Sequence, residues 1–142
     1  RQQVSCLSVS VCVSVSAGGD GNVEAVRSWV ASGADINMGN EYGITPLMWT
    51  SFNHDAVCVA ELLRLGADVR RVDGDGKTAL HWVAECGRDE GGGEKVVRLL
   101  VAAGCDTAAR DNGGVTALDF ARTCGGADWG PEFEGWVAAA MA

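Results

Sequence analysis

The sequence predicts an all-α solenoid of about four helix-turn-helix units with hairpin turns, in which the first and last units are irregular. A closing segment recurs as SGADIN (32–37), LGADVR (65–70) and AGCDTA (103–108), and an opening segment recurs as NEYGITPLMW (40–49), DGDGKTALHW (73–82) and DNGGVTALDF (111–120). Both series step first by 33 residues and then by 38. Two series with one shared offset indicate stacked repeats, in which each unit buries its apolar face against its neighbours.

Each unit is predicted to hold two helices between its opening and closing segments. The stretches VEAVRSWV, VCVAELL and KVVRLLV carry apolar residues at helical spacing, and each is followed by a glycine that can end a helix in a left-handed conformation. A threonine precedes each first helix, where its hydroxyl can accept a hydrogen bond from a free backbone N–H. The third unit is longer than the second, and RDEGGGEK (88–95) is expected to form a flexible loop between its helices.

These motifs resemble the ankyrin repeat. The family pattern runs from a D-x-x-G-x turn through T-P-L-H-x-A-A to a second helix and a closing G-A-D-V-N, and here TPL (45–47), GADV (66–69) and TALH (78–81) match it. The resemblance covers about residues 20–137. It implies binding rather than catalysis, because hairpin tips and first helices of this family line a concave surface that grips a protein or a peptide. It implies no cofactor and no metal.

The domain boundaries are expected to follow the register of the repeats. The predicted segments are an irregular or disordered N-terminal arm (1–19), an ankyrin repeat domain (20–137) with units at about 20–39, 40–72, 73–110 and 111–137, and a C-terminal tail (138–142). Valine alternates with smaller residues in the arm, which is the period of a strand rather than of a helix. In the last unit, Pro131 is expected near the start of a capping helix that a longer loop delays.

Composition argues against several classes of partner. The net charge is −8 and the isoelectric point is near 4.6, while the 11 basic residues are scattered along the chain. An acidic surface without a basic patch repels nucleic acid and anionic membrane. No small-molecule substrate is expected, and the chain is expected to be a monomer.

The cysteines are expected to be free thiols in a reducing compartment, which places the protein in the cytoplasm or the nucleus. The six cysteines form no C-x-x-C motif and lie at positions 6, 12, 58, 86, 105 and 124. An even number leaves disulfides as an alternative. A secretory signal in the N-terminal valine–serine stretch is a further alternative, which its many serines disfavour.

His81 and Cys86 are the most obvious candidates for catalysis, as a base and a thiol nucleophile. Five residues on one helix separate two side chains by roughly 140° around the axis, so the pair is not expected to meet. The resemblance implies a structural role for His81 at the start of its helix. His54 stands where the family usually has glycine, and it is expected to lie on the surface. The chain is therefore expected not to be an enzyme.

The family's variable contact positions imply a set of partner-binding residues. They are Glu41, Tyr42, Ile44, Phe52 and Asn53 in the second unit, Asp75, Lys77, Glu85 and Cys86 in the third, and Asn112, Val115 and Thr123 in the fourth. Tyr42, Ile44 and Phe52 are expected to be the main anchors, because they are large and apolar at positions without a role in the core. Trp49, Trp82 and Phe120 occupy one equivalent position, where packing between units is favoured over a ligand platform.

Two alternatives to a free-standing binding module stay open. The chain begins at Arg1, so it is expected to be a fragment or a processed product. It could be the targeting segment of a larger enzyme such as a ubiquitin ligase, a kinase or an acyltransferase. It could also be a structural spacer, which a fully polar concave face would favour.

Overall fold

A computed structural model describes residues 26–28, 30–33, 35–39, 42–85, 93–124 and 126–141. The predicted arm at 1–19 and the predicted contact residues Glu41 and Cys86 lie outside the described residues. Residues 26–28 and 30–31 are helical, where the sequence predicts the second helix of the first unit. The helices that follow are α3 (Pro46–Phe52), α4 (Ala56–Arg64), α5 (Ala79–Glu85), α6 (Gly93–Ala102), α7 (Ala117–Cys124) and α8 (Gly126–Met141).

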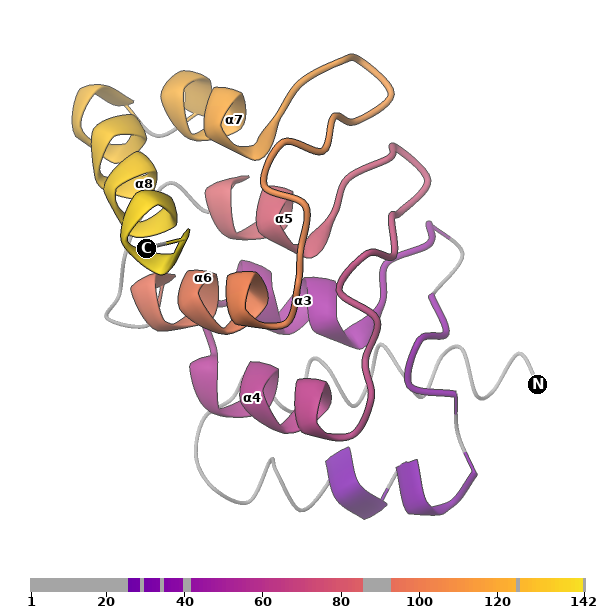
Figure 1. The fold of residues 1–142 in the computed structure, drawn as a ribbon. Coiled ribbons are helices and arrows are strands. Elements are labelled where there is room, and N and C mark those ends of the chain that lie inside the picture. The colour runs from indigo at the N-terminus through magenta and orange to yellow at the C-terminus, as the bar shows by residue number, and fades with distance from the viewer. Residues whose placement is uncertain are drawn as a thin grey trace.

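The helices form two layers, which confirms the all-α ankyrin solenoid (Figure 1). Helix α5 packs between α3 and α7 in the inner layer, and α6 packs between α4 and α8 in the outer layer. Among the described residues, extended pairing is confined to one bridge between Arg110 and Thr116. The core runs between the layers and includes Val59, Leu62, Leu80, Val83, Val96, Leu100 and Phe133.

Hairpin loops precede α5 and α7 and project from one side of the helix stack (Figure 1). The backbone N–H of Gly74 donates to the carbonyl of Tyr42 at 2.8 Å, and the N–H of Asn112 donates to the carbonyl of Asp75 at 2.9 Å. Gly76 has a φ of +79°, and a Cβ at this position would lie only 2.9 Å from the backbone nitrogen of Asn112. The hairpins are therefore linked from unit to unit by main-chain hydrogen bonds and close backbone approach.

The last unit differs from its prediction. Helix α8 begins at Gly126, only two residues after α7 ends. The predicted long loop between these two helices is therefore wrong. Pro131 lies inside α8 rather than near its start, and the helix continues to Met141 through most of the predicted tail. Phe133 and Trp136 are buried, because α8 packs against both α6 and α7.

Two further predictions are wrong, and one contact explains both. His54 is buried, with 7% of its surface exposed, and its Nε2 lies 3.2 Å from the carbonyl oxygen of Val83. The predicted loop at 88–95 is wrong only at its end, because α6 begins at Gly93, while residues 88–92 lie outside the described residues. A Cβ on Gly93 would lie 2.8 Å from the Trp136 ring and 3.1 Å from the His54 ring. Only a glycine lets α6 begin between these two side chains.

Glu61 joins the first unit to the second. It lies on α4 with 7% of its surface exposed, and its carboxylate accepts hydrogen bonds from Arg64 and from Arg27, the latter at 2.8 Å. The hydrogen bonds from Arg64 and then from Arg27 lower the pKa of Glu61 from 4.5 to about 2. The ionised carboxylate is therefore the form that the folded chain stabilises.

This pKa shift predicts loss of stability in acid. Because the pKa is lower in the folded chain, the contribution of Glu61 is complete above pH 4.5 and disappears as the pH falls from 4.5 to about 2. The unfolding free energy of the natural chain should therefore fall more steeply over this range than that of Glu61→Gln. Urea titrations of both proteins at pH 7, 4.5, 3 and 2 would measure the difference. An equal gap between the two proteins at every pH would contradict this account.

The energetic effect of the close approach at Gly76 can be measured separately from that of its left-handed backbone conformation. Gly104 has a φ of +95° and nothing within 4 Å of a built Cβ, so Gly104→Ala should cost only the strain of the left-handed conformation, about 1–2 kcal/mol. Gly76→Ala should lower the unfolding free energy further, because its Cβ would also displace the hairpin at Asn112. Denaturant unfolding of the two variants measures the difference. Equal losses would show that the hairpins separate without cost.

Candidate functional site

The repeat register places equivalent side chains of the second, third and fourth units in four columns. We call these positions the inner face, because they lie on the hairpins and on the inner-layer helices. The columns are Tyr42, Asp75 and Gly113; Ile44, Lys77 and Val115; Trp49, Trp82 and Phe120; and Phe52, Glu85 and Thr123.

Aromatic rings connect the second unit to the third on the inner face. The centroid of the Phe52 ring lies 5.9 Å from that of Trp49 on the same helix and 5.7 Å from that of Trp82 on α5, the latter edge-on at 88°. Such pairs stabilise by about 0.5–1.5 kcal/mol beyond their buried area. Tyr42 is 65% exposed on its hairpin. Ile44 packs against the core, so the expectation that it has no role there is wrong.

Lys77 connects the third unit to the fourth. Its Nζ lies 5.6 Å from the centroid of the Trp82 ring and 4.9 Å from that of Phe120. The same Nζ lies 3.5 Å from a carboxylate oxygen of Glu85. Only 16% of the Lys77 side chain is exposed. The ammonium group is therefore held between two rings and a carboxylate, where cation–π attraction adds to the ion pair.

Asp73 fixes the geometry of the third unit, and it was missing from the predicted contact residues. Its Oδ1 accepts the backbone N–H groups of Asp75 at 2.9 Å and Lys77 at 3.0 Å, and its Oδ2 accepts the indole N–H of Trp82 at 3.2 Å. One buried carboxylate thus holds both the backbone of the hairpin and the indole ring of Trp82 in position. The signal in the sequence was an aspartate nine residues before an aromatic residue, which recurs as Asp111 and Phe120.

His81 has the structural role that the resemblance implies. Its Nδ1 accepts the backbone N–H of Thr78 at 3.1 Å, so the ring proton resides on Nε2, which lies 2.9 Å from the carbonyl oxygen of Val115 in the next hairpin. The ring is 1% exposed and packs edge-on against Phe120. Both nitrogens of His81 are thus engaged in fixing one unit to the next.

Three further predicted residues are held by side-chain hydrogen bonds to backbone carbonyls, one of them between hairpins. The Asn112 side chain donates to the carbonyl of Gly74 at 3.2 Å, and the Asn53 side chain donates to that of Trp49 at 3.0 Å. The Thr123 hydroxyl donates to the carbonyl of Asp119 at 3.0 Å. The backbone N–H of Val115, followed by that of Gly113, lowers the pKa of Asp111, which is therefore ionised where it closes its hairpin.

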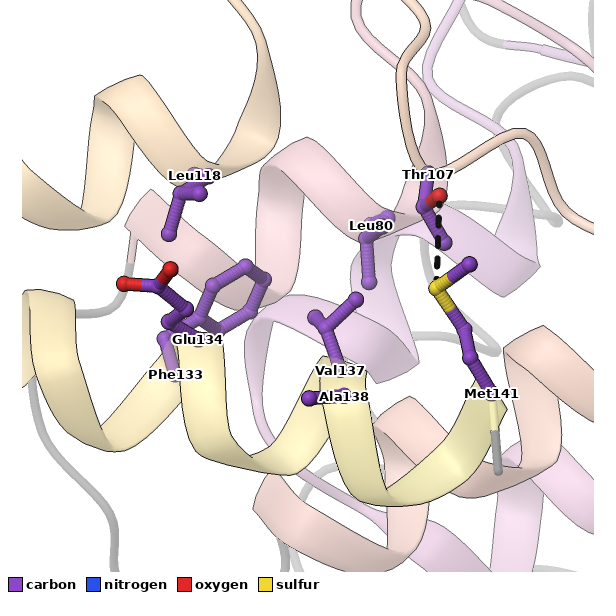
Figure 2. Close-up of a pocket in the computed structure, with 8 residues that line it drawn as sticks. All are labelled: Leu80, Thr107, Leu118, Phe133, Glu134, Val137, Ala138 and Met141. Carbon is purple, nitrogen blue, oxygen red and sulfur yellow. Dashed lines mark hydrogen bonds between the residues drawn. The ribbon is translucent and has the colours of Figure 1, made fainter.

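An apolar cavity of about 220 Å³ lies between α5, α7 and α8 (Figure 2). Its lining residues are Leu80, Thr107, Leu118, Phe133, Glu134, Val137, Ala138 and Met141. Its polar groups are already engaged, since the Thr107 hydroxyl donates to the Met141 sulfur at 3.8 Å and Glu134 pairs with Arg122 at 3.4 Å. Among the described residues that line the cavity, none offers a free polar group that would orient a ligand.

The described residues do not indicate a reactive cysteine or a metal site. Cys58 and Cys105 are both reduced thiols, and Cys58 is buried. Burial and the neighbouring Asp106 raise the pKa of Cys105 to about 11, which makes it a poor nucleophile. No three His, Cys, Asp or Glu side chains within the described ranges are arranged to hold a metal ion. Likewise, none of the helices described is long and apolar enough to span a bilayer.

The similarity of this chain to known proteins agrees with the stacked helix pairs. The family described as "Ankyrin repeats (3 copies)" matches residues 12–111, and the match starts inside the segment predicted as an arm. A 48-residue stretch is 42% identical to palmitoyltransferase AKR1 of Saccharomyces cerevisiae. That stretch is 34% of this chain but only 6% of the relative, so the chain spans a small part of the relative's length.

The hydrogen bond between Asp73 and Trp82 predicts an energetic coupling. Asp73→Asn keeps an oxygen for the backbone N–H groups but places an amide NH₂ against the indole, and Trp82→Phe removes the indole N–H. The two changes together should cost less than the sum of the single changes, by about 1 kcal/mol. Urea unfolding of the natural chain, the two single variants and the double variant gives this value. Strict additivity would show that the bond does not hold the ring.

Proposed function

Because the chain belongs to the ankyrin repeat family, we propose that its inner face binds a protein or peptide partner. The observation that carries the proposal is a row of aromatic side chains on three units, beside the largely exposed Tyr42. Phe52 packs against Trp49 and Trp82, and Lys77 joins Trp82 to Phe120. Tyrosine and tryptophan are over-represented among the residues that dominate binding energy in protein interfaces. A surface with such residues gains most of its affinity from a few contacts.

The hydrogen bonds behind the inner face support the same proposal. Asp73 and His81 fix the hairpins against the helices, and main-chain bonds join one hairpin to the next. A surface that is already ordered loses little conformational entropy when a partner binds. The acidic chain disfavours nucleic acid, and we propose a monomer in the cytoplasm or nucleus, where reduced thiols such as Cys58 and Cys105 persist.

A second candidate function follows from the likeness to a palmitoyltransferase. In that case these units would bind and position a protein substrate for a larger enzyme, and acyl transfer would occur in a part of the protein outside this sequence. The complete transcript would decide between the two candidates. An open reading frame that continues into a catalytic region supports the second candidate, and one that contains only repeats supports the first.

Substitution of Tyr42 and Phe52 tests partner binding. Tyr42→Ala with Phe52→Ala should raise the dissociation constant of a partner by roughly 30-fold or more, since loss of dominant interface residues costs about 2 kcal/mol. The partner would be identified by in-cell cross-linking and mass spectrometry, and its affinity measured by calorimetry. Circular dichroism would confirm that the variant stays helical.

The matched control removes exposed apolar surface from the outer layer. Val57 on α4 and Met141 on α8 are 55% and 63% exposed, so Val57→Ala with Met141→Ala removes exposed apolar side chains from the outer layer. This control should bind the partner as the natural chain does. Equal affinity of the natural chain and the Tyr42/Phe52 variant would refute binding at the inner face.

A further inference from the structure

The charges of the inner face are confined to its middle unit. The second unit contributes Tyr42, Ile44, Trp49 and Phe52, and the fourth contributes Gly113, Val115, Phe120 and Thr123, all without formal charge. The third contributes Asp75, Lys77, Trp82 and Glu85. The inner face therefore has an aromatic end, a middle unit with two carboxylates and one ammonium group, and an end with smaller side chains.

The single ammonium group is already engaged within the chain. Lys77 lies between the Trp82 and Phe120 rings and pairs with Glu85, so little of its charge is offered outward. Asp75 is exposed and forms no ion pair with any residue in the described ranges. A third of the Glu85 side chain is exposed. The middle of the inner face thus carries a net negative charge that Lys77 does not cancel.

Neighbouring cations do not reverse this sign. Arg110 donates to the carbonyl of Gly114 at 3.2 Å and keeps its charge, but the ionised Asp111 precedes that hairpin and Asp119 also lies within reach of the Arg110 charge. Arg122 pairs with Glu134 on α8 at 3.4 Å. The whole chain carries a net charge of −8. A cationic partner is therefore attracted to the inner face, and an anionic partner is repelled.

We infer that the occupant of the inner face is an extended basic segment of a partner protein, with an apolar side chain against the second unit and an arginine or lysine against the third. The inference rests on the proposed function. A guanidinium suits the third unit best, because it can stack on an aromatic ring while it pairs with a carboxylate. Here the Phe52 and Trp82 rings pack together, Glu85 lies one turn after Trp82 on α5, and the exposed carboxylate of Asp75 lies on the same unit.

The spacing of the two side chains follows from the repeat. Stacked helices lie about 8–10 Å apart, and an extended chain advances about 3.3 Å per residue. An apolar residue over the second unit and a basic residue over the third are therefore about three residues apart. The partner motif is an apolar residue and an arginine or lysine at that separation.

Selection from a random dodecapeptide display library tests the inference, because such a selection requires no candidate partner. The intact 142-residue chain is the target, and the folded Tyr42→Ala/Phe52→Ala variant is used in parallel to remove peptides that bind elsewhere. The selected peptides should share an apolar residue and an arginine or lysine about three positions apart. Their affinity should fall as the salt concentration rises.

Charge variants of the chain give the second measurement. Asp75→Asn with Glu85→Gln changes the formal charge of the inner face from −1 to +1, because Lys77 remains. A selected peptide should bind this variant at least tenfold more weakly. The control, Asp106→Asn with Glu132→Gln, removes two exposed carboxylates outside the inner face and should leave the affinity unchanged.

The outcomes separate the inference from the proposed function. Peptides that are acidic or uncharged, but that still require Tyr42 and Phe52, would overturn the basic motif and leave binding at the inner face intact. A selection that yields no peptide sensitive to the Tyr42/Phe52 change would overturn both. A basic consensus that ignores the Asp75/Glu85 change would overturn the assignment of the cation to the third unit.

Discussion

Stacking of each unit on its neighbour is the interaction on which the whole molecule depends. A pair of short helices leaves one apolar surface uncovered, and here Leu80 and Leu100 are buried only because further helices lie on both sides of α5 and α6. Because these contacts join neighbours alone, stability accumulates along the stack. The same arrangement accommodates the extra residues of the third unit, since they lie between α5 and α6 and α6 still packs between α4 and α8.

Buried polar groups then convert a stack of helices into a defined surface. Asp73 binds two backbone N–H groups and an indole, and His81 links the start of α5 to the next hairpin. Each would be costly to bury without partners. Their bonds therefore fix the angle between hairpin and helix. The hairpins can in turn carry different tip residues, such as Tyr42 and Asp75, without a change of backbone.

The repeat register predicted the paired helices and the capping threonines, because periodic spacing reports which residues share an environment. It failed where contacts join non-equivalent residues. Helix α6 begins at Gly93 because Trp136 and His54 close around it, and neither side chain has an equivalent in the other units. The packing of Ile44 against the core and the ring contacts of Phe52 were missed for a related reason. Equivalent positions share a backbone, but their packing depends on what the neighbouring unit presents.

This dependence on neighbours explains the one cation of the inner face. Phe52 fills the space against Trp82 between the second and third units. One repeat further on, Glu85 takes the position of Phe52 and Phe120 that of Trp82, so no ring is available to fill the equivalent space. Lys77 lies there instead, with its ammonium over both rings and against Glu85. A methylene chain with a charged end satisfies an aromatic surface and a carboxylate together. Where an acid replaces the ring, the lysine thus fills the space beside it, and the pair of Lys77 and Glu85 leaves Asp75 as the uncompensated charge of the inner face.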